Sequence, residues 1–285
     1  MSRETRDAPA ALDGGYSFLT NILVLVWRQE SISIEGRGIP RPSKKFEEDR
    51  EMLFKGKKII DLSQEIYTGM PVYPGHAKTV IWEHVSHEET KRNLGTGFSY
   101  QSSGIMMCDH GPTHVDSVSH LSPDPQAPSV DEIPLEHCVT SGICIDVSDV
   151  PVQTQFGPEK IELQLKKWNL DIRPGDVILF YTGHYQRYYG QPEYSSHQPG
   201  LTRAATEYIL DRGAISFGVD NTSPDMFLDK TYPCHMVCRE RKITHYENLC
   251  NLDKLVGKRF TFIALPLKIR NGTGSPVRPV AILDE

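Results

Sequence analysis

Cysteine is scarce in this sequence, and an excess of positive charge is missing. The 285 residues include six cysteines, too few for a disulfide framework and typical of a protein kept in a reducing compartment. The 31 Lys and Arg residues are outnumbered by 37 Asp and Glu residues, so the composition predicts no basic surface for a nucleic acid. We therefore expect a cytoplasmic protein that does not bind nucleic acid.

Long hydrophobic runs are also missing. The apolar run Phe18–Trp27 is far shorter than the roughly 20 residues that a transmembrane helix needs. Acidic residues precede it and no small-residue cleavage site follows it, which argues against a signal peptide. We expect no membrane partner. The run fits a strand or a helix packed on a neighbouring subunit, and the expected assembly is a homodimer or homotetramer.

The chain is expected to consist of an N-terminal extension or arm, residues 1–57, and one larger domain, residues 58–285. The extension is polar over residues 35–57, with a short helix expected near Glu47–Phe54. In the domain, apolar segments bounded by Gly, Pro or Asp predict strands, and apolar residues at helical spacing predict helices. The strands are expected at 142–147, 177–181, 214–219 and 260–265, and the helices at 161–168 and 202–212. Residues 185–197, rich in Tyr, Gln and Pro, are expected to form a long loop.

Three of the eleven histidines fall in one short stretch, His110-Gly-Pro-Thr-His114-Val-Asp116-Ser-Val-Ser-His120. The Gly-Pro pair argues against a continuous helix, so a loop leading into a short strand is expected. In an extended segment His114 and Asp116 point to the same side, and His110 can fold over to join them. Neutral imidazoles and a carboxylate are suitable ligands for a divalent metal. His120 is either a further ligand or a base beside the metal.

Ordinary structural roles compete with this interpretation. Three imidazoles so close together would repel one another when protonated on a surface, which favours a metal or catalytic role for the cluster. A second group, His235 with the segment His245-Tyr-Glu247, lies downstream and could add one nitrogen and one carboxylate. Its spacing alone favours ordinary roles for His235 and Glu247.

The sequence resembles a family of metal-dependent hydrolases, the cyclase family, which includes bacterial kynurenine formamidase and isatin hydrolase. The histidine-rich stretch matches the family motif H-x-G-T-H-x-D-x-P-x-H at its four functional positions. Pro112 and Val118 depart from that motif, in positions that affect loop shape. Other family-like segments follow in order, and the resemblance covers about residues 58–285. These segments are Asp61–Ser63, Gly69–Gly75, Gly218–Asp225, Pro233–Leu249 and Pro266–Arg278.

The resemblance implies a fold, a cofactor and residue roles. The fold is a mixed α+β domain of the swivelling β/β/α type, and the cofactor is one or two divalent ions, Zn or Mn. His120 is implied as the general acid/base, and Tyr73 stands where the family often has a Trp that lines the substrate pocket. The implied ligands are His110, His114 and Asp116 for a first metal, and Asp116, His235 and Glu247 for a second.

The implied activity is hydrolysis of a carbon–nitrogen amide bond in a small substrate, an N-formyl aryl amine or an isatin-like lactam, by metal-activated water. A bound ion lowers the pKa of water from about 15.7 toward about 7. Alternatives are a lactone hydrolase, a non-hydrolytic cyclase or dehydratase on the same site, and a metal-binding protein without activity. Several aromatic residues would suit a planar substrate, or equally would pack in the core: Tyr73, Phe98, Tyr100, Tyr181 and Tyr185.

Overall fold

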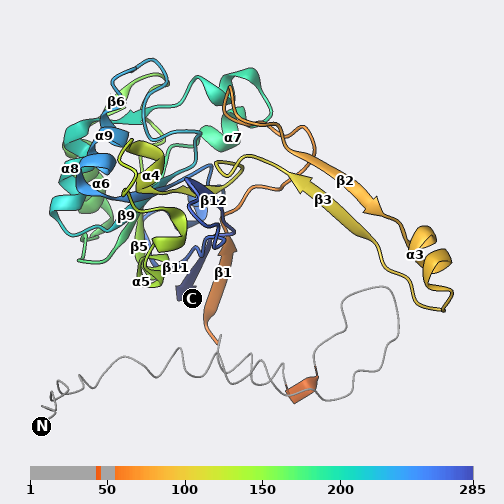
Figure 1. The fold of residues 1–285 in the computed structure, drawn as a ribbon. Coiled ribbons are helices and arrows are strands. Elements are labelled where there is room, and N and C mark those ends of the chain that lie inside the picture. The colour runs from red at the N-terminus through yellow and green to blue at the C-terminus, as the bar shows by residue number, and fades with distance from the viewer. Residues whose placement is uncertain (1–42, 46–54, 285) are drawn as a thin grey trace, which may run out of the picture. The chain divides into compact units, whose positions relative to one another are not determined.

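The computed structural model describes residues 43–45 and 55–284. The chain divides into two compact units, Met1–Lys55 and Gly56–Glu285, and the second is a single mixed α+β domain (Figure 1). The predicted run at 18–27 and the predicted helix near 47–54 lie outside the described residues. The division at residue 57, the cytoplasmic location and the homo-oligomer stay predictions. Among the described residues, we find no helix whose length and hydropathy would let it span a bilayer.

Strands and short helices alternate through the domain. The strands are β1 (Lys57–Asp61), β2 (Val80–Val85), β3 (Ser102–Met106), β4 (His114–Asp116), β5 (Val139–Asp146), β6 (Gln155–Phe156), β7 (Val177–Tyr181), β8 (Gly200–Leu201), β9 (Ser216–Val219), β10 (Thr244–Glu247), β11 (Arg259–Ile263), β12 (Gly274–Pro276) and β13 (Val280–Asp284). The α-helices are α3 (His87–Leu94), α4 (Val118–Leu121), α5 (Leu135–Cys138), α6 (Pro158–Trp168), α7 (His184–Tyr188), α8 (Arg203–Asp211) and α9 (Pro233–Arg241). Single 3-10 turns are η2 (Val130–Glu132), η3 (Pro192–Ser195) and η4 (Leu252–Leu255).

One curled sheet organises the described part of the domain, with the strand order β1-β13-β11-β5-β7-β9-β10-β4-β12. Its centre is parallel, because β5, β7, β9 and β10 pair in the same direction, and the flanking pairs are antiparallel. A strand buried on both faces has a continuous run of apolar residues. β7 is an example, because its successive side chains enter two different core clusters. Val177 and Leu179 enter one core cluster, whereas Ile178 and Phe180 enter the other.

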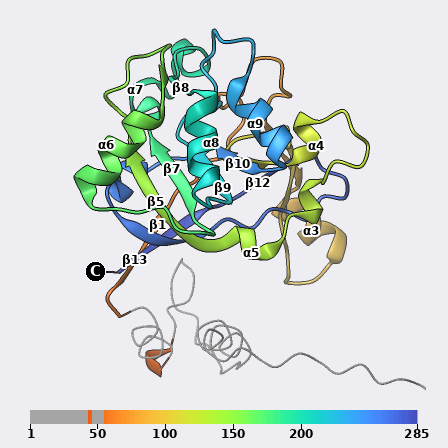
Figure 2. The ribbon, with the colours of Figure 1, turned by 90° about the vertical axis from the view of Figure 1, so that its left-hand side faces the viewer.

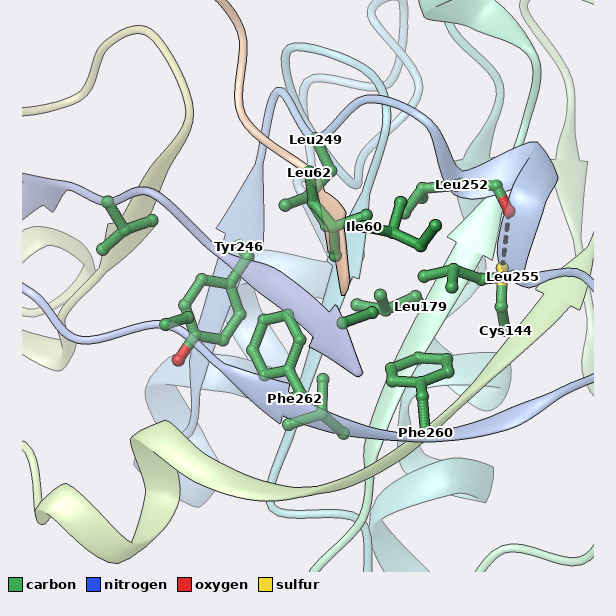
Figure 3. Close-up of a cluster of buried hydrophobic side chains, with 14 of the residues drawn as sticks. Ile60, Leu62, Cys144, Leu179, Tyr246, Leu249, Leu252, Leu255, Phe260 and Phe262 are labelled. Carbon is green, nitrogen blue, oxygen red and sulfur yellow. Dashed lines mark hydrogen bonds between the residues drawn. The ribbon is translucent and has the colours of Figure 1, made fainter. Parts of the chain in front are cut away.

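The two faces of the sheet are covered differently. On one face, α6, α8 and α9 pack against the strands (Figure 2) and contribute Ile161, Ile209 and Cys238 to the core. On the other face, Leu179 and Tyr246 meet Phe262 from the curling strand β11 and Leu255 from η4 (Figure 3). Apolar contacts thus cover both faces of the central strands β5 and β7.

The predicted strands and helices are confirmed within a few residues. Thr202 begins α8 as expected, since its hydroxyl accepts a hydrogen bond from the Ala205 N–H at 3.1 Å, and Gly213 follows the helix with a φ of +96°. The predicted long loop at 185–197 is wrong. It contains α7 and η3, and the rings of Tyr185 and Tyr189, one helical turn apart, lie against each other at a tilt of 41° with centroids 4.8 Å apart.

A two-stranded ribbon, β2 paired with β3, extends away from the sheet and carries α3 at its end (Figure 1). Ser86 caps the start of α3, and Gly95 ends it with a φ of +62°. The segment that leads back from α3 into β3 contains Phe98 and Tyr100, whose exposed fractions are 65% and 48%. Neither residue is therefore part of the core.

Candidate metal centre

Two antiparallel strands near one end of the sheet, just inside the edge strand β12, place the first donor groups. In the β4–β10 pair, His245 lies opposite Asp116 and Glu247 lies opposite His114. Side chains two residues apart on a strand point to the same face, so all four groups converge on one point. The Nε2 atom of His114 lies 3.1 Å from Asp116 Oδ1 and 3.5 Å from Glu247 Oε2. The predicted short strand with His114 and Asp116 on one side is confirmed.

His110 folds back from the preceding loop, as the sequence predicted. Its Nδ1 lies 2.7 Å from Asp116 Oδ1, and its Nε2 lies 3.0 Å from the Thr273 hydroxyl. The ring lies directly against Gly274 of the neighbouring strand β12. A Cβ at this glycine would come within 2.7 Å of His110 Cε1, so the absence of a side chain there leaves room for the imidazole.

Hydrogen bonds on the outer nitrogens orient two of the imidazoles. His114 donates from Nδ1 to the Pro112 carbonyl at 2.9 Å, and His235, on α9, pairs through Nδ1 with the Asp225 carboxylate. Such partners fix the tautomer and direct the Nε2 lone pair inward, as is usual for metal-bound histidines. The Nε2 of His235 lies 3.7 Å from Glu247 Oε1 and 4.0 Å from Asp116 Oδ2.

The structure adds His245 to the predicted set. This histidine is fully buried, and its Nε2 lies 3.2 Å from Glu247 Oε1 and 3.4 Å from Asp116 Oδ2. We missed it because the prediction took one nitrogen and one carboxylate from the downstream group. The two-residue step from His245 to Glu247 in an extended segment places both on one face, and this signal was present in the sequence.

Charges within the cluster suit a cation. Burial alone would raise the pKa of Asp116, but the neighbouring histidines, His245 foremost, hold that pKa well below its usual value. Burial by itself would lower the pKa of His245, but Asp116 together with Cys238 and Glu247 outweighs this effect and raises the pKa well above its usual value. Asp116 is therefore a carboxylate at the centre of the cluster. The donor atoms of one group all lie within 4.8 Å of one another: Asp116, His235, His245 and Glu247.

The cluster forms one wall of a cavity of about 380 Å³. His120, at the end of α4, lines this cavity with its side chain 35% exposed, and its Nε2 lies 3.7 Å from Asp116 Oδ2. Its ring lies 3.9 Å from that of His110, centroid to centroid. Partial burial lowers the pKa of His120 to about 4, against the opposing effect of Asp116.

Of the aromatic residues expected around a planar substrate, Tyr73 lines the cavity. The other four do not line it. Phe98 and Tyr100 lie near the end of the ribbon, Tyr181 packs against the core as the alternative expected, and the ring of Tyr185, on α7, lies against that of Tyr189. The structure thus brings together every predicted ligand with His120 and Tyr73, while the roles assigned to these residues stay predictions.

Comparison with known proteins gives consistent matches. A family model described as "Putative cyclase" matches residues 60–226. Isatin hydrolase of Roseibium aggregatum is 25% identical over 196 residues, which cover 63% of this chain and 73% of that protein. Kynurenine formamidase of Bordetella petrii is 26% identical over 224 residues, 79% of this chain and 97% of that protein. The solved structure of isatin hydrolase A from Labrenzia aggregata bound to benzyl benzoate has a TM-score of 0.72 and 25% identity, and the match covers 85% of this chain and all of that one.

Proposed function

The chain belongs to the cyclase family of metal-dependent hydrolases, and we propose that it hydrolyses a carbon–nitrogen amide bond in a small substrate. The proposal rests on one observation above all. Two buried carboxylates, Asp116 and Glu247, and the inward-facing nitrogens of the neighbouring histidines meet at the wall of a cavity large enough for a small ligand.

The donor set fits a divalent ion such as Zn or Mn. Imidazole nitrogens and carboxylate oxygens are ligands that both metals accept, and the outer hydrogen bonds of His114 and His235 have already fixed the tautomers that an ion requires. We propose His110, His114 and Asp116 as the holders of a first ion. Asp116, His235 and Glu247, with His245 added, would hold a second. An ion bound there would polarise the substrate carbonyl and activate a water molecule.

His120 is the proposed acid/base. Its Nε2 lies next to Asp116 at the cavity wall, while part of the ring reaches solvent. It can therefore take a proton released during attack on the carbonyl and deliver it to the leaving nitrogen as the C–N bond breaks. Once that proton has gone to the nitrogen, His120 is neutral again and ready for the next turnover.

The substrate we propose is an N-formyl aryl amine or an isatin-like lactam, which are the classes named for the relatives above. A cavity of about 380 Å³ lies within the range of small-molecule sites. Tyr73 offers a flat surface beside it, and its ring lies 5.3 Å from that of His76. An aromatic amide of one or two rings would stack there.

A hydrolysis screen of the metal-loaded full chain tests this function. N-formylkynurenine, isatin and a simple lactone are supplied in parallel, with chelator-treated protein as the control. We expect metal-dependent turnover of at least one of the two amides. Turnover of the lactone alone would favour a lactone hydrolase, and bound metal without turnover of any of the three would point to a protein that only binds metal.

A further inference from the structure

A chain of buried hydrogen bonds holds the side chain of Asn248 at the cavity wall. Asn248 follows the carboxylate Glu247 and lines the same cavity. Its Oδ1 accepts a hydrogen bond from the Tyr194 hydroxyl at 2.8 Å, and that hydroxyl accepts one from Gln64 Nε2 at 2.6 Å. Tyr194 and Gln64 are 2% and 5% exposed, so this chain of bonds is shielded from water.

The backbone of Asn248 is held as firmly as its side chain. The residue has a φ of +57°, a left-handed conformation that asparagine tolerates better than most residues. Its N–H donates to the Asn221 carbonyl at 2.9 Å, and its own carbonyl accepts from the Thr113 hydroxyl at 2.6 Å. Thr113 also accepts a hydrogen bond from the Gln64 N–H. Thr113 therefore binds both Gln64 and Asn248, which are the two ends of the network.

One polar group of this network, the amide nitrogen of Asn248, remains available to a ligand. A phenol has a single hydrogen, and burial raises the pKa of Tyr194 well above its usual value, so that hydrogen stays and goes to Asn248 Oδ1. The amide Nδ2 then points away from Tyr194 with two hydrogens, for which the described residues provide no acceptor. The same cavity holds a second polar atom of this kind, since the Thr222 hydroxyl is buried and has no partner among the described residues.

We infer that Asn248 is a substrate-specificity residue that donates a hydrogen bond from Nδ2 to an acceptor oxygen of the substrate other than the reacting carbonyl. The reacting carbonyl belongs at the metal cluster, and Asn248 adjoins that cluster along the cavity wall. This inference rests on the proposed function and narrows the substrate class to amides that carry a second acceptor oxygen. Tyr194 acts as a positioning residue, because its hydrogen bond to Oδ1 fixes Nδ2 as the end of the Asn248 side-chain amide that meets the ligand.

The test compares two ligands that differ in one oxygen. Binding of 2-aminoacetophenone and of 2-ethylaniline to the metal-loaded full chain is measured by calorimetry, so that no turnover is needed. The wild type should bind the ketone about five- to tenfold more tightly, the effect of one neutral hydrogen bond. Asn248→Ala should bring the ratio to about one. Tyr194→Phe, which keeps the ring, should lower the ratio while the metal content stays unchanged.

Asn169→Ala is the matched control, because Asn169 is an exposed asparagine with a φ of +50° that ends α6 outside the cavity. It should keep the wild-type ratio. A wild type without preference, an unchanged ratio in Asn248→Ala, or an equal loss of affinity for both ligands would each overturn the inference. If Asn248→Ala does not fold, Tyr194→Phe decides. The N-formyl derivatives of both amines are assayed in parallel. If neither these derivatives nor isatin is hydrolysed while the binding ratio behaves as expected, the proposed function fails, and Asn248 stands only as a hydrogen-bond donor to the ligand.

Discussion

Acid should destabilise this protein through one buried histidine outside the metal cluster. His184, at the start of α7, is fully buried, and its ring lies between those of Tyr188 and Tyr194. Its Nε2 donates to the Tyr194 carbonyl at 2.7 Å, whereas Nδ1 has no partner among the described residues. Burial lowers the pKa of His184 to about 4, so the folded protein keeps this imidazole neutral.

The sign of the effect follows from proton uptake. Below the ordinary histidine pKa of about 6.5, the unfolded chain binds a proton at this position and the folded chain does not until about pH 4. His184 therefore leaves the free energy of unfolding unchanged above pH 7 and lowers it as the pH falls. The two pKa values give a loss of about 2 kcal/mol at pH 5 and about 3 kcal/mol at pH 4.

Urea unfolding between pH 8 and pH 4 measures this loss. His184→Gln removes the titrating group. The quantity compared is the difference in unfolding free energy between wild type and variant, because the contributions of the other ionisable groups then cancel. The wild type should lose about 2 kcal/mol more than the variant between pH 7.5 and pH 5. His84→Gln, at an exposed position on β2, is the control and should follow the wild type. If the unfolding free energies of wild type and His184→Gln fell by the same amount with pH, the reasoning would be refuted.

Two further predictions concern the candidate metal centre. His120→Ala should lower turnover by about 10²–10⁴ while the metal content stays intact; full activity in this variant, measured with elemental analysis of the same sample, would contradict its acid/base role. Asp225→Asn should weaken metal affinity by about 10–100-fold, because His235 loses the carboxylate that orients it; a competition titration against a chelator measures this, and wild-type affinity would show that Asp225 does not tune the site.

Local sequence patterns predicted the features that depend on residues close together in the chain. The stretch from His110 to His120 contains a loop, a three-residue strand and one helical turn, and the two-residue period of a strand was enough to place His114 beside Asp116. The buried runs 143–145 of β5 and 177–180 of β7 were recognisable for a different reason. Both are buried on two faces, so apolar residues follow one another without alternation.

Contacts between distant segments could not be predicted from spacing. The metal-ligand roles of His235 and Glu247 were implied by the family resemblance, because local spacing does not show that the β10–β4 pairing brings Glu247 beside His114 or that α9 brings His235 to the same point. The hydrogen bond that Asp225 accepts from His235 and the bonds that link Gln64, Tyr194 and Asn248 are likewise non-local.

The loop predicted at 185–197 was wrong for a related reason. Its composition is typical of loops, but the contact between the rings of Tyr185 and Tyr189, and the hydrogen bond of His184 to Tyr194, stabilise helical turns there. Such tertiary contacts can override local preference.

The central claim is that a divalent ion held around Asp116 is required for amide hydrolysis. The most direct test removes metal with a chelator, returns Zn or Mn in steps, and follows bound ion and turnover of N-formylkynurenine or isatin in the same samples. Turnover of the wild type should recover in proportion to the ion bound, and Asp116→Ala should neither bind the ion nor recover. Full turnover by the chelated protein, or a complete complement of metal in Asp116→Ala, would contradict it.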